Sequence, residues 1–456
     1  MPDHATLDQL CIDTVRTLAI DAIQQANSGH PGTVMGAAPT AYCLWQRFLR
    51  YDPWDPCWLN RDRFVLSAGH ASMLLYSLIH LAGVKAANPS YERLDRAAVT
   101  LDDIKTFRQA GSRCPGHPEY GWTSGVEATT GLLGQGVAMS VGMAIAGRWL
   151  AATYNRPGFD LFDYRVYALG GDGCMMEGIS AEAASLAAHL RLSNLCWIYD
   201  SNRITIEGAT SLAFTEDVAA RFLGYGWSVV RVADANDLDL LSRAYQTFPA
   251  TRDRPTLIIV ESHIGHGAPH RQGTREAHGE PLGPEEVRLT KQSYGWDPDA
   301  KFLVPDGVRE HFQAQLGRRG AEARTVWQER RAAYRTEHPD LAQQLERIED
   351  GGLPAGWEGD LPVFPPDAKG MAGRDASSKT LNAIAERVPW FLGGSADLWP
   401  STKTRLTFET AGEFQAPGHG GTTAGATFTS GSASTPWRRS PTDSPCRGCA
   451  RMPRAS

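Results

Sequence analysis

The sequence lacks the features of a membrane or secreted protein. None of its apolar runs is long enough to cross a bilayer, and the first ten residues, MPDHATLDQL, contain neither the basic nor the apolar segment of a signal peptide. No basic stripe stands out, and the net charge is −6 with a pI near 6.1. We therefore expect neither nucleic acid nor an anionic membrane as a partner.

Clustered cysteines are scarce as well. Six of the eight cysteines are scattered singly along the chain, which is typical of a reduced compartment and predicts a cytoplasmic location. Cys446 and Cys449 form a CxxC pair, but no second pair and no neighbouring strand accompany them. We interpret this pair as a chance occurrence.

Leu, Ile and Val are missing from the last fifty residues, 407–456. The chain as a whole is 42% hydrophobic and 21% charged, which is the composition of a soluble globular protein. Its length of 456 residues predicts two or three domains.

Short apolar runs alternate with helical patterns in the middle of the chain. We expect strands at 165–170, 194–200, 226–232 and 255–261, and helices at the N-terminus and at 176–190. This alternation predicts an α/β fold with a parallel sheet. A Gly- and Pro-rich stretch at 351–373 predicts a linker, and the patterns at 380–388 and 390–398 predict the start of a second α/β domain.

The segment YALGGDGCMMEGIS, followed by CWIYDSNRITI, carries the clearest chemical signal. Asp172 follows one predicted strand and Asn202 follows the next, so both lie at the carboxyl edge of the sheet, where open α/β folds bind ligands. With the carbonyl of Ile204 they offer three oxygen ligands to Mg²⁺, and Gly173 leaves room for a diphosphate. A simple surface turn is the alternative interpretation of this Gly-Asp-Gly.

At this point the sequence resembles the thiamine-diphosphate enzymes, and among them the transketolase family. The resemblance runs almost continuously from residue 11 to 401 and rests on GDGCMMEGIS together with SGHPG (28–32), DRFVLSAGHASMLLYSL (62–78), PGHPE (115–119), TTGLLGQG (129–136), AHGEPLG (277–283) and GGSADLWPS (393–401). It implies a parallel-sheet fold with a complete diphosphate-binding domain at 1–345, a linker at 346–376 and the start of a pyrimidine-binding domain at 377–420.

The resemblance also implies the site residues around the cofactor. Asp172, Asn202 and the Ile204 carbonyl would hold Mg²⁺ or Ca²⁺, and His70 and Gly173 would contact the phosphates. Further cofactor contacts would come from Gly131, Leu132, Leu133, His278 and Asp397. The family usually has Pro at the place of Leu132.

Catalytic and substrate-binding roles follow from the same motifs. The resemblance assigns His30, His117 and His278 to the substrate side, where imidazoles can move protons near neutral pH. Each of them alone could instead be a surface or core histidine. Arg374 and Ser401 match groups that hold the sugar phosphate, although Asp375 stands where the family tends to have Lys.

Two other features have alternative interpretations. Glu177 and Glu182 match carboxylates at the family's subunit interface, and a plain role on a helix surface is the alternative. The histidines of SHIGHGAPH (262–270) could suggest a metal site, but no carboxylate or Cys in that stretch completes a set, and we interpret them as loop residues.

The function expected from the resemblance is reversible transfer of a two-carbon ketol unit from a ketose phosphate to an aldose phosphate. The expected partners are sugar phosphates and a second copy of the chain, since the family's cofactor lies between two subunits. A dihydroxyacetone synthase-like activity, a 1-deoxyxylulose-phosphate synthase and an inactive, truncated fragment are the alternatives.

Residues 421–456 are expected to be an aberrant, disordered tail, read out of frame after the loss of one base near codon 421. Shifting the frame over 427–456 permits a segment containing FGVREHAM, which resembles the transketolase segment whose glutamate activates the cofactor. A genuine disordered tail, for which Ser, Pro and Arg are ordinary, is the alternative. A frameshift would leave the chain without that glutamate and without its C-terminal domain, and the chain alone is then expected to be inactive.

Overall fold

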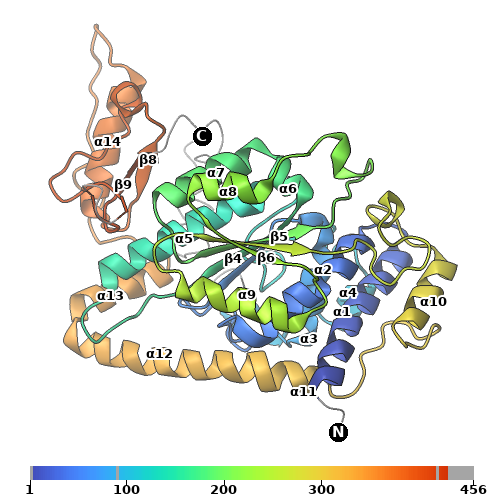
Figure 1. Cartoon of the computed structure of the whole chain (residues 1–456). Coiled ribbons are helices and arrows are strands. Elements are labelled where there is room, and N and C mark those ends of the chain that lie inside the picture. Colours follow the sequence, from blue (N-terminus) through green and yellow to red (C-terminus); the bar gives the residue numbers. More distant parts are fainter. Residues whose placement is uncertain (1–3, 89–91, 417–420, 430–456) are drawn as a thin grey trace.

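A five-stranded parallel sheet lies at the centre of the computed structural model, which describes residues 4–88, 92–416 and 421–429 (Figure 1). The strand order is β1 (Arg63–Leu66), β4 (Val166–Gly171), β5 (Leu195–Ser201), β7 (Thr256–Glu261) and β6 (Ser228–Val232). All neighbouring pairs in this sheet are parallel. The predicted α/β class with a parallel sheet is confirmed.

The strands are apolar on both faces because helices cover both sides of the sheet. In β4, Tyr167 and Leu169 belong to one core, whereas Val166 and Ala168 belong to the other. Successive side chains of a strand point to opposite faces, so a strand buried on both sides reads as a continuous apolar run. This explains why the central strands could be recognised in the sequence.

Two groups of helices form these covering layers. The first core includes residues of α1 (His4–Ala26), α2 (Pro31–Cys43), α3 (Ser72–Leu81) and α9 (Leu238–Ala250). The second includes residues of α5 (Gln135–Tyr154), α7 (Gly178–His189) and α8 (Val218–Tyr225). Figure 1 shows the sheet between the two groups.

Shorter elements and two long helices complete this unit. A hairpin is formed by β2 (Lys85–Ala87) and β3 (Arg93–Ala97), and the remaining helices are α4 (Leu101–Lys105), α6 (Asp172–Met176), α10 (Pro284–Ser293), α11 (Val308–Phe312), α12 (Arg318–Glu337) and α13 (Pro339–Glu349). Short 3₁₀ or π segments lie at 44–48, 69–71, 210–212, 275–277 and 313–317. The long helix α12 is fastened by hydrogen bonds from Trp327 to the Leu161 carbonyl (2.7 Å) and from Tyr334 to the Tyr154 carbonyl (2.7 Å).

A small second unit follows the irregular stretch after α13. It contains α14 (Gly373–Arg387), β8 (Gly393–Ser395), α15 (Trp399–Thr402) and β9 (Thr427–Thr429), and β8 pairs with β9 in parallel. Its side chains Val388, Trp390, Phe414 and Phe428 join the second core of the large unit. In Figure 1 it lies at the upper left, whereas α10 lies at the right.

Two sequence-based boundaries differ from the structure. Helix α13 ends inside the predicted linker at 346–376, and helix α14 begins inside it. Both helices extend beyond the apolar residues from which their bounds were predicted. The disordered tail predicted for 421–456 is wrong for 427–429, since β9 lies there and Thr427 and Phe428 are buried. The rest of the predicted frameshifted segment, 430–456, with its CxxC pair, lies outside the described residues.

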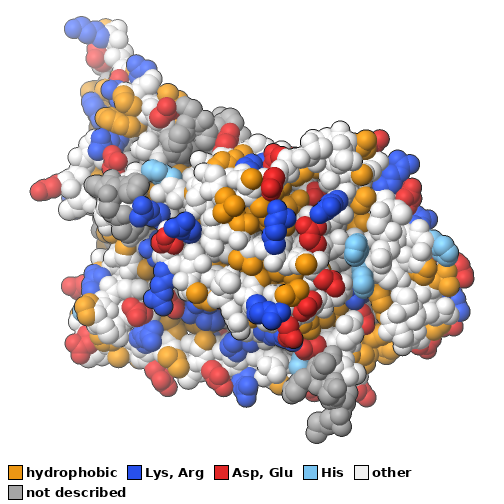
Figure 2. All heavy atoms as spheres, in the orientation of Figure 1, with side chains coloured by type: hydrophobic (Ala, Val, Ile, Leu, Met, Phe, Trp, Pro, Cys, Tyr) orange, Lys and Arg blue, Asp and Glu red, His pale blue; other side chains and the backbone are white. Residues whose placement is uncertain are grey.

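The surface agrees with the composition of the chain. On the face shown in Figure 2, basic and acidic side chains are interspersed over the whole view, and neither charge forms a continuous stripe. The six cysteines among the described residues are free. In the part of the chain that the structure describes, no helix is both long enough and apolar enough to span a bilayer.

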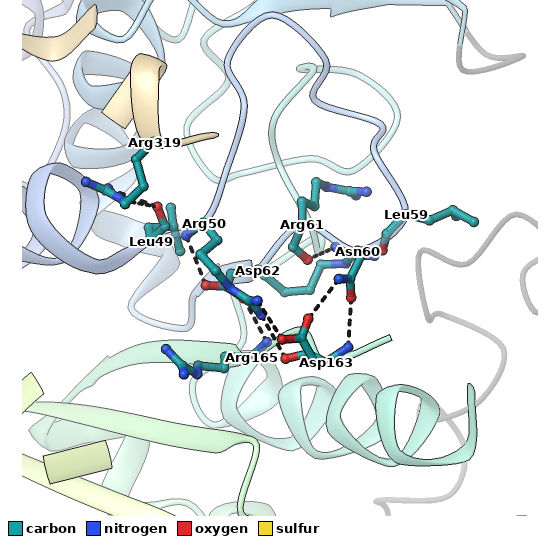
Figure 3. Close-up of polar contacts among 10 residues, drawn as sticks. Leu49, Arg50, Leu59, Asn60, Arg61, Asp62, Asp163, Arg165 and Arg319 are labelled. Carbon is teal, nitrogen blue, oxygen red and sulfur yellow. Dashed lines mark hydrogen bonds and ion pairs between the residues drawn. The ribbon is translucent and has the colours of Figure 1, made fainter. Parts of the chain in front are cut away.

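A buried polar network joins the chain segments that lead into β1 and β4 (Figure 3). Asp62 is fully buried and accepts hydrogen bonds from the backbone amide of Arg165 (2.9 Å) and from the guanidinium of Arg50 (3.1 Å). Arg50 also donates to Asp163 (2.8 Å), whose other carboxylate oxygen accepts from Asn60 (2.8 Å). One carboxylate, Asp62, therefore links two segments that lie 103 positions apart in sequence.

We expect Asp62→Ala to lower the free energy of unfolding by roughly 3–5 kcal/mol, because it leaves buried donors of Arg50 and Arg165 unpaired. Urea denaturation measures this change. Glu322→Ala is the control, since the Glu322 pair with Arg318 is exposed and such pairs contribute about 0.5 kcal/mol. Equal effects of the two substitutions would contradict the importance of the network.

Candidate functional site

The residues that follow β4 and β5 meet at the carboxyl edge of the sheet. Asp172 comes directly after β4, is 4% exposed, and accepts a hydrogen bond at Oδ2 from the backbone amide of Arg203 (3.0 Å). At Oδ1 it accepts from the hydroxyl of Tyr199 (2.7 Å). Burial raises the pKa of Asp172, and these hydrogen bonds oppose that shift.

The loop after β5 supplies the other two predicted metal ligands. Asn202 Oδ1 accepts a hydrogen bond from the backbone amide of Ile204 (3.1 Å). Arg203, between them, has a left-handed backbone with φ of 64°, which is uncommon outside glycine and typical of functional turns. The left-handed turn brings its amide to Asp172, so the loop and the strand end form one edge.

The donor set suits a hard cation. A carboxylate, an amide oxygen and a backbone carbonyl are the ligands that Mg²⁺ and Ca²⁺ take in proteins, and each oxygen of Asp172 keeps a second lone pair. Among the described residues, no group of three or more His, Cys, Asp or Glu side chains is placed to hold a metal. The predicted ligand set contains only one side chain of these types, Asp172. Its other two ligands are an amide oxygen and a backbone carbonyl, so it differs from a cluster of His, Cys and carboxylate ligands.

Three histidines from distant parts of the chain gather beside this edge. The ring centroids of His30 and His70 are 5.1 Å apart, those of His70 and His278 are 5.2 Å apart, and those of His30 and His278 are 5.9 Å apart. His30 precedes α2, His70 lies in the turn after β1, and His278 lies in the long loop after β7. The structure thus brings together three of the predicted histidines.

Burial holds these imidazoles in the neutral form at pH 7. It lowers the pKa of His30 to about 4, with further contributions from His278, Arg108 and His117. It lowers the pKa of His70 to about 3 and also lowers the pKa values of His117 and His278. Crowded imidazoles in a partly dry site cannot all be charged, so each keeps one donor and one acceptor nitrogen.

The glycine-rich turn at 129–136 lies between the histidines and the diphosphate motif. A Cβ placed on Gly131 would lie 3.4 Å from the His117 ring, and one on Gly173 would lie 2.7 Å from Leu133. Leu132, between them, is 67% exposed. Four predicted residues, His117, Gly131, Leu133 and Gly173, are therefore neighbours, while the Leu132 side chain points to solvent.

Close backbone contacts hold the loop that carries His278. A Cβ on Gly32 would lie 2.4 Å from the carbonyl oxygen of Ala277, and the Gly32 carbonyl accepts from the Gly265 amide (3.0 Å). Gly279 approaches both His30 and Ile206, at 3.6 and 3.2 Å from its would-be Cβ. The first turn of α2, this loop and the loop after β5 thus support one another.

The histidines at 263–270 lie in this loop, as interpreted from the sequence. His263 is exposed, and His270 Nδ1 pairs with the Glu286 carboxylate at 2.8 Å. Glu286 belongs to α10, so this contact ties the loop to a helix.

Several contacts of the site could not be found from the sequence. Arg108 lies 3.4 Å from His30 Nδ1 and donates to Ser28 (2.7 Å), and Thr33 lies 3.5 Å from His70 Nε2. Arg108 carries no local sequence signal, because its role depends on a turn that faces α2. Thr33 follows SGHPG directly, and only its place next to that motif could have indicated it.

The structure does not bring the other predicted residues to this cluster within one chain. Arg374, Asp397 and Ser401 are exposed residues of the second unit, which lies at the upper left in Figure 1. Glu177 is exposed between α6 and α7, and Glu182 is partly buried on α7.

Comparisons with known proteins agree with this geometry. Residues 7–354 match the family model described as transketolase, thiamine diphosphate binding domain. A transketolase of Geobacillus stearothermophilus is 52% identical over 401 residues, and transketolase 1 of Saccharomyces cerevisiae is 45% identical over 421 residues. The chain belongs to the transketolase family.

Solved transketolases have the same fold as this chain. A transketolase of Pichia stipitis, solved in complex with sedoheptulose-7-phosphate, superposes with a TM-score of 0.90 at 40% identity over 97% of this chain and 63% of that chain. The Campylobacter jejuni transketolase gives 0.84 at 36% identity over 98% of this chain and 64% of that chain. The matches cover 88% and 92% of this chain but only 58% and 59% of the Geobacillus and Saccharomyces proteins, so the chain spans about three fifths of their length.

The histidine cluster predicts that the free energy of unfolding decreases as the pH is lowered. The folded-state pKa of His70 lies far below the ordinary value of 6.5, so between these values the unfolded chain binds a proton that the folded chain does not. The free energy of unfolding is therefore highest above about pH 6.5. It decreases as the pH falls towards 4, by up to about 1.4 kcal/mol per pH unit for each histidine of this kind. His70→Gln should flatten this slope.

Urea denaturation at several pH values between about 7 and 4.5 measures the slope. The control is His263→Gln, which removes an exposed imidazole outside the cluster. A His70→Gln variant with the slope of the unmodified chain would show that His70 does not titrate as described.

Proposed function

We propose that this chain carries the diphosphate half of a transketolase site and serves the reversible transfer of a two-carbon ketol unit between sugar phosphates. The observation that carries the proposal is the convergence of three neutral histidines beside the Asp172–Asn202 edge, in a chain of this family. The edge offers oxygen ligands for a cation, and the histidines offer proton donors and acceptors.

The residues present fit thiamine diphosphate with a divalent cation. Asp172, Asn202 and the Ile204 carbonyl would hold Mg²⁺ or Ca²⁺, which neutralises a diphosphate. Gly173 has no side chain to fill the space beside Asp172, and His70 would donate to phosphate oxygens. The Nδ1 of His278 is buried without a hydrogen-bond partner, as expected of a group that waits for a ligand.

When bound, thiamine diphosphate supplies a nucleophilic carbon and an electron sink. The chain's own residues hold and move the protons of the sugar hydroxyls. Arg108 has only donors, so His30 Nδ1 accepts from it and His30 carries its proton on Nε2. His278 and His117 can exchange protons with a substrate, and a bound diphosphate would raise their pKa values towards neutrality.

A second copy of the chain completes the proposed site. Arg374, Asp397 and Ser401 belong to the second unit, and no hydrogen bond or ring contact in the part of the chain that the structure describes joins them to the three histidines. In a homodimer the second unit of one copy could face the first unit of the other, with Glu177 at the contact. Residues 1–345, 346–376 and 377–420 would then act as the diphosphate domain, the linker and the start of the pyrimidine domain.

Ketose phosphates are the proposed donors. Transketolase structures from Pichia stipitis hold sedoheptulose-7-phosphate, xylulose-5-phosphate and fructose-6-phosphate, which are all ketose phosphates. Arg374 can bind a phosphate by charge-assisted hydrogen bonds, and Ser401 can add a hydroxyl contact. Free, scattered cysteines suit a cytoplasmic enzyme.

An inactive fragment that binds the cofactor without turnover is the second candidate. It is favoured because the histidines lie in the first unit of the chain and Arg374, Asp397 and Ser401 lie in the second. Ketol transfer from xylulose-5-phosphate, measured with ribose-5-phosphate and with formaldehyde as acceptors, distinguishes the possibilities. Transfer to the aldose phosphate supports a transketolase, and transfer to formaldehyde alone supports a dihydroxyacetone synthase-like enzyme. Binding of cofactor without any transfer supports the inactive fragment.

We expect Asp172→Asn to abolish Mg²⁺-dependent binding of thiamine diphosphate, because the edge loses its only carboxylate ligand. Isothermal titration calorimetry with and without Mg²⁺ measures the effect. The control is Glu207→Gln, which makes the same chemical change at an exposed position on the same loop. An Asp172→Asn variant that keeps the affinity of the unmodified chain would refute the metal assignment.

In a full-length version whose reading frame is restored near codon 421, we expect His278→Ala to lower kcat by about 10²–10⁴-fold while cofactor affinity changes little, because a positioned proton donor is lost. Steady-state assays with xylulose-5-phosphate and ribose-5-phosphate, together with calorimetry of cofactor binding, separate the two effects. His263→Ala, in the exposed part of the same loop, should leave kcat unchanged. Turnover at the unmodified rate in His278→Ala would assign this residue a structural role.

A further inference from the structure

Two adjacent residues at the end of β5 contact the two candidate metal ligands. Tyr199 and Asp200 are 5% and 2% exposed, and their side chains point to opposite faces of the sheet. In the parallel register they lie opposite Gly170 and Gly171, the residues that lead into Asp172. They are therefore at the level of the metal edge without belonging to the ligand set.

Tyr199 holds the Asp172 carboxylate from one side. Its hydroxyl donates to Oδ1 at 2.7 Å, while the Arg203 amide donates to Oδ2 at 3.0 Å. A carboxylate held by donors on both oxygens cannot rotate freely about its χ2 angle. Its remaining lone pairs then face a fixed direction.

Asp200 determines which end of the Asn202 amide faces a cation. Its Oδ2 accepts from Asn202 Nδ2 at 2.8 Å, and its Oδ1 accepts from the hydroxyl of Ser262 at 2.5 Å. A carboxylate whose two oxygens both accept hydrogen bonds selects the NH₂ end of the amide. The oxygen end is turned away, where it also accepts from the Ile204 amide (3.1 Å).

The two contacts have a common consequence. An amide can ligate a cation only through its oxygen, and a flipped Asn202 would present an NH₂ group instead. A freely rotating Asp172 would lose rotational entropy when the cation binds. Outer contacts of this kind typically change metal affinity by 10–100-fold.

We propose that Tyr199 and Asp200 are positioning residues for a divalent cation, Tyr199 by holding Asp172 and Asp200 by setting the orientation of the Asn202 amide. The inference rests on the proposed function, since that function places the cation here. It adds a pair of residues that do not touch the cation and yet control its affinity.

The test uses Mn²⁺ and inorganic diphosphate as probes. Together they require only the edge formed by Asp172, Asn202 and the Ile204 carbonyl, and not the rest of the cofactor site. Calorimetric titration of the chain with Mn²⁺ in the presence of diphosphate gives the Kd. Tyr199→Phe and Asp200→Asn keep the shape of each side chain. Each should weaken Mn²⁺ binding by about tenfold or more.

The control is Asp217→Asn, which removes one negative charge from the rim of the adjacent hollow of about 390 Å³, also lined by Tyr199. Asn can still cap α8, where the Asp217 carboxylate now accepts from the Ala220 amide, so the fold is kept. The Mn²⁺ affinity of Asp217→Asn should stay within about twofold of that of the unmodified chain. Thermal unfolding without metal should give similar Tm values for Tyr199→Phe, Asp200→Asn and Asp217→Asn.

The possible results separate the positioning role of Tyr199 and Asp200 from the proposed function. Weakened binding in Tyr199→Phe and Asp200→Asn, with Asp217→Asn unaffected, supports the inference. Unchanged binding in both variants overturns it and leaves the proposed function intact, and an equal loss in Asp217→Asn also overturns it, because charge alone would then explain the effect. A chain that binds no Mn²⁺ with diphosphate contradicts the proposed function itself, and the inference fails with it.

Discussion

The parallel pairing of β4 with β5 is the constraint on which the site depends. Gly170 lies opposite Tyr199 and Gly171 opposite Asp200, so both strands end at the same edge and their following residues meet. A slip of one residue would exchange the faces to which Tyr199 and Asp200 point. Neither the Asp172 carboxylate nor the Asn202 amide would then have its present partner.

The sheet also explains how histidines from distant segments come together. His70 follows β1, and the loop that carries His278 follows β7, so both begin at the carboxyl edge. His30 joins them because glycines let the first turn of α2 approach the backbone of that loop. The edge therefore presents oxygen ligands on one side and neutral imidazoles on the other, which complements a metal-bound diphosphate and the protons of a substrate.

The sequence predicted the elements whose patterns are local. The strands β4, β5, β6 and β7 were recognised because both of their faces are apolar or because they end in a marked turn. β1 was not recognised, since it has four residues and begins with Arg63, which is buried by bonding to the Leu59 carbonyl (2.8 Å) and by packing on the Tyr164 ring (4.6 Å). The sequence does not predict the hairpin of β2 and β3, because its strands have only three and five residues and contain few large apolar side chains.

The sequence also predicts only part of the candidate site. Asp172 and Asn202 could be paired from the strand–helix–strand order, because that order places both at one edge. The histidines could be assigned only through resemblance, since nothing in the spacing of His30, His70 and His278 predicts that their rings meet. The contacts of Arg108 and Asp200 depend on side-chain directions across elements, and a pattern of residue types does not contain this information.

The exposed apolar residues around the edge complete the argument for a second chain. Leu132 and Ile206 are 67% and 68% exposed in the loops beside the histidines. Apolar side chains at the rim of a polar site are stabilised when another surface covers them. In Figure 1 the second unit lies at the upper left and α10 lies at the right. In the homodimer proposed above, a surface of the second copy that carries Arg374, Asp397 and Ser401 would cover these side chains.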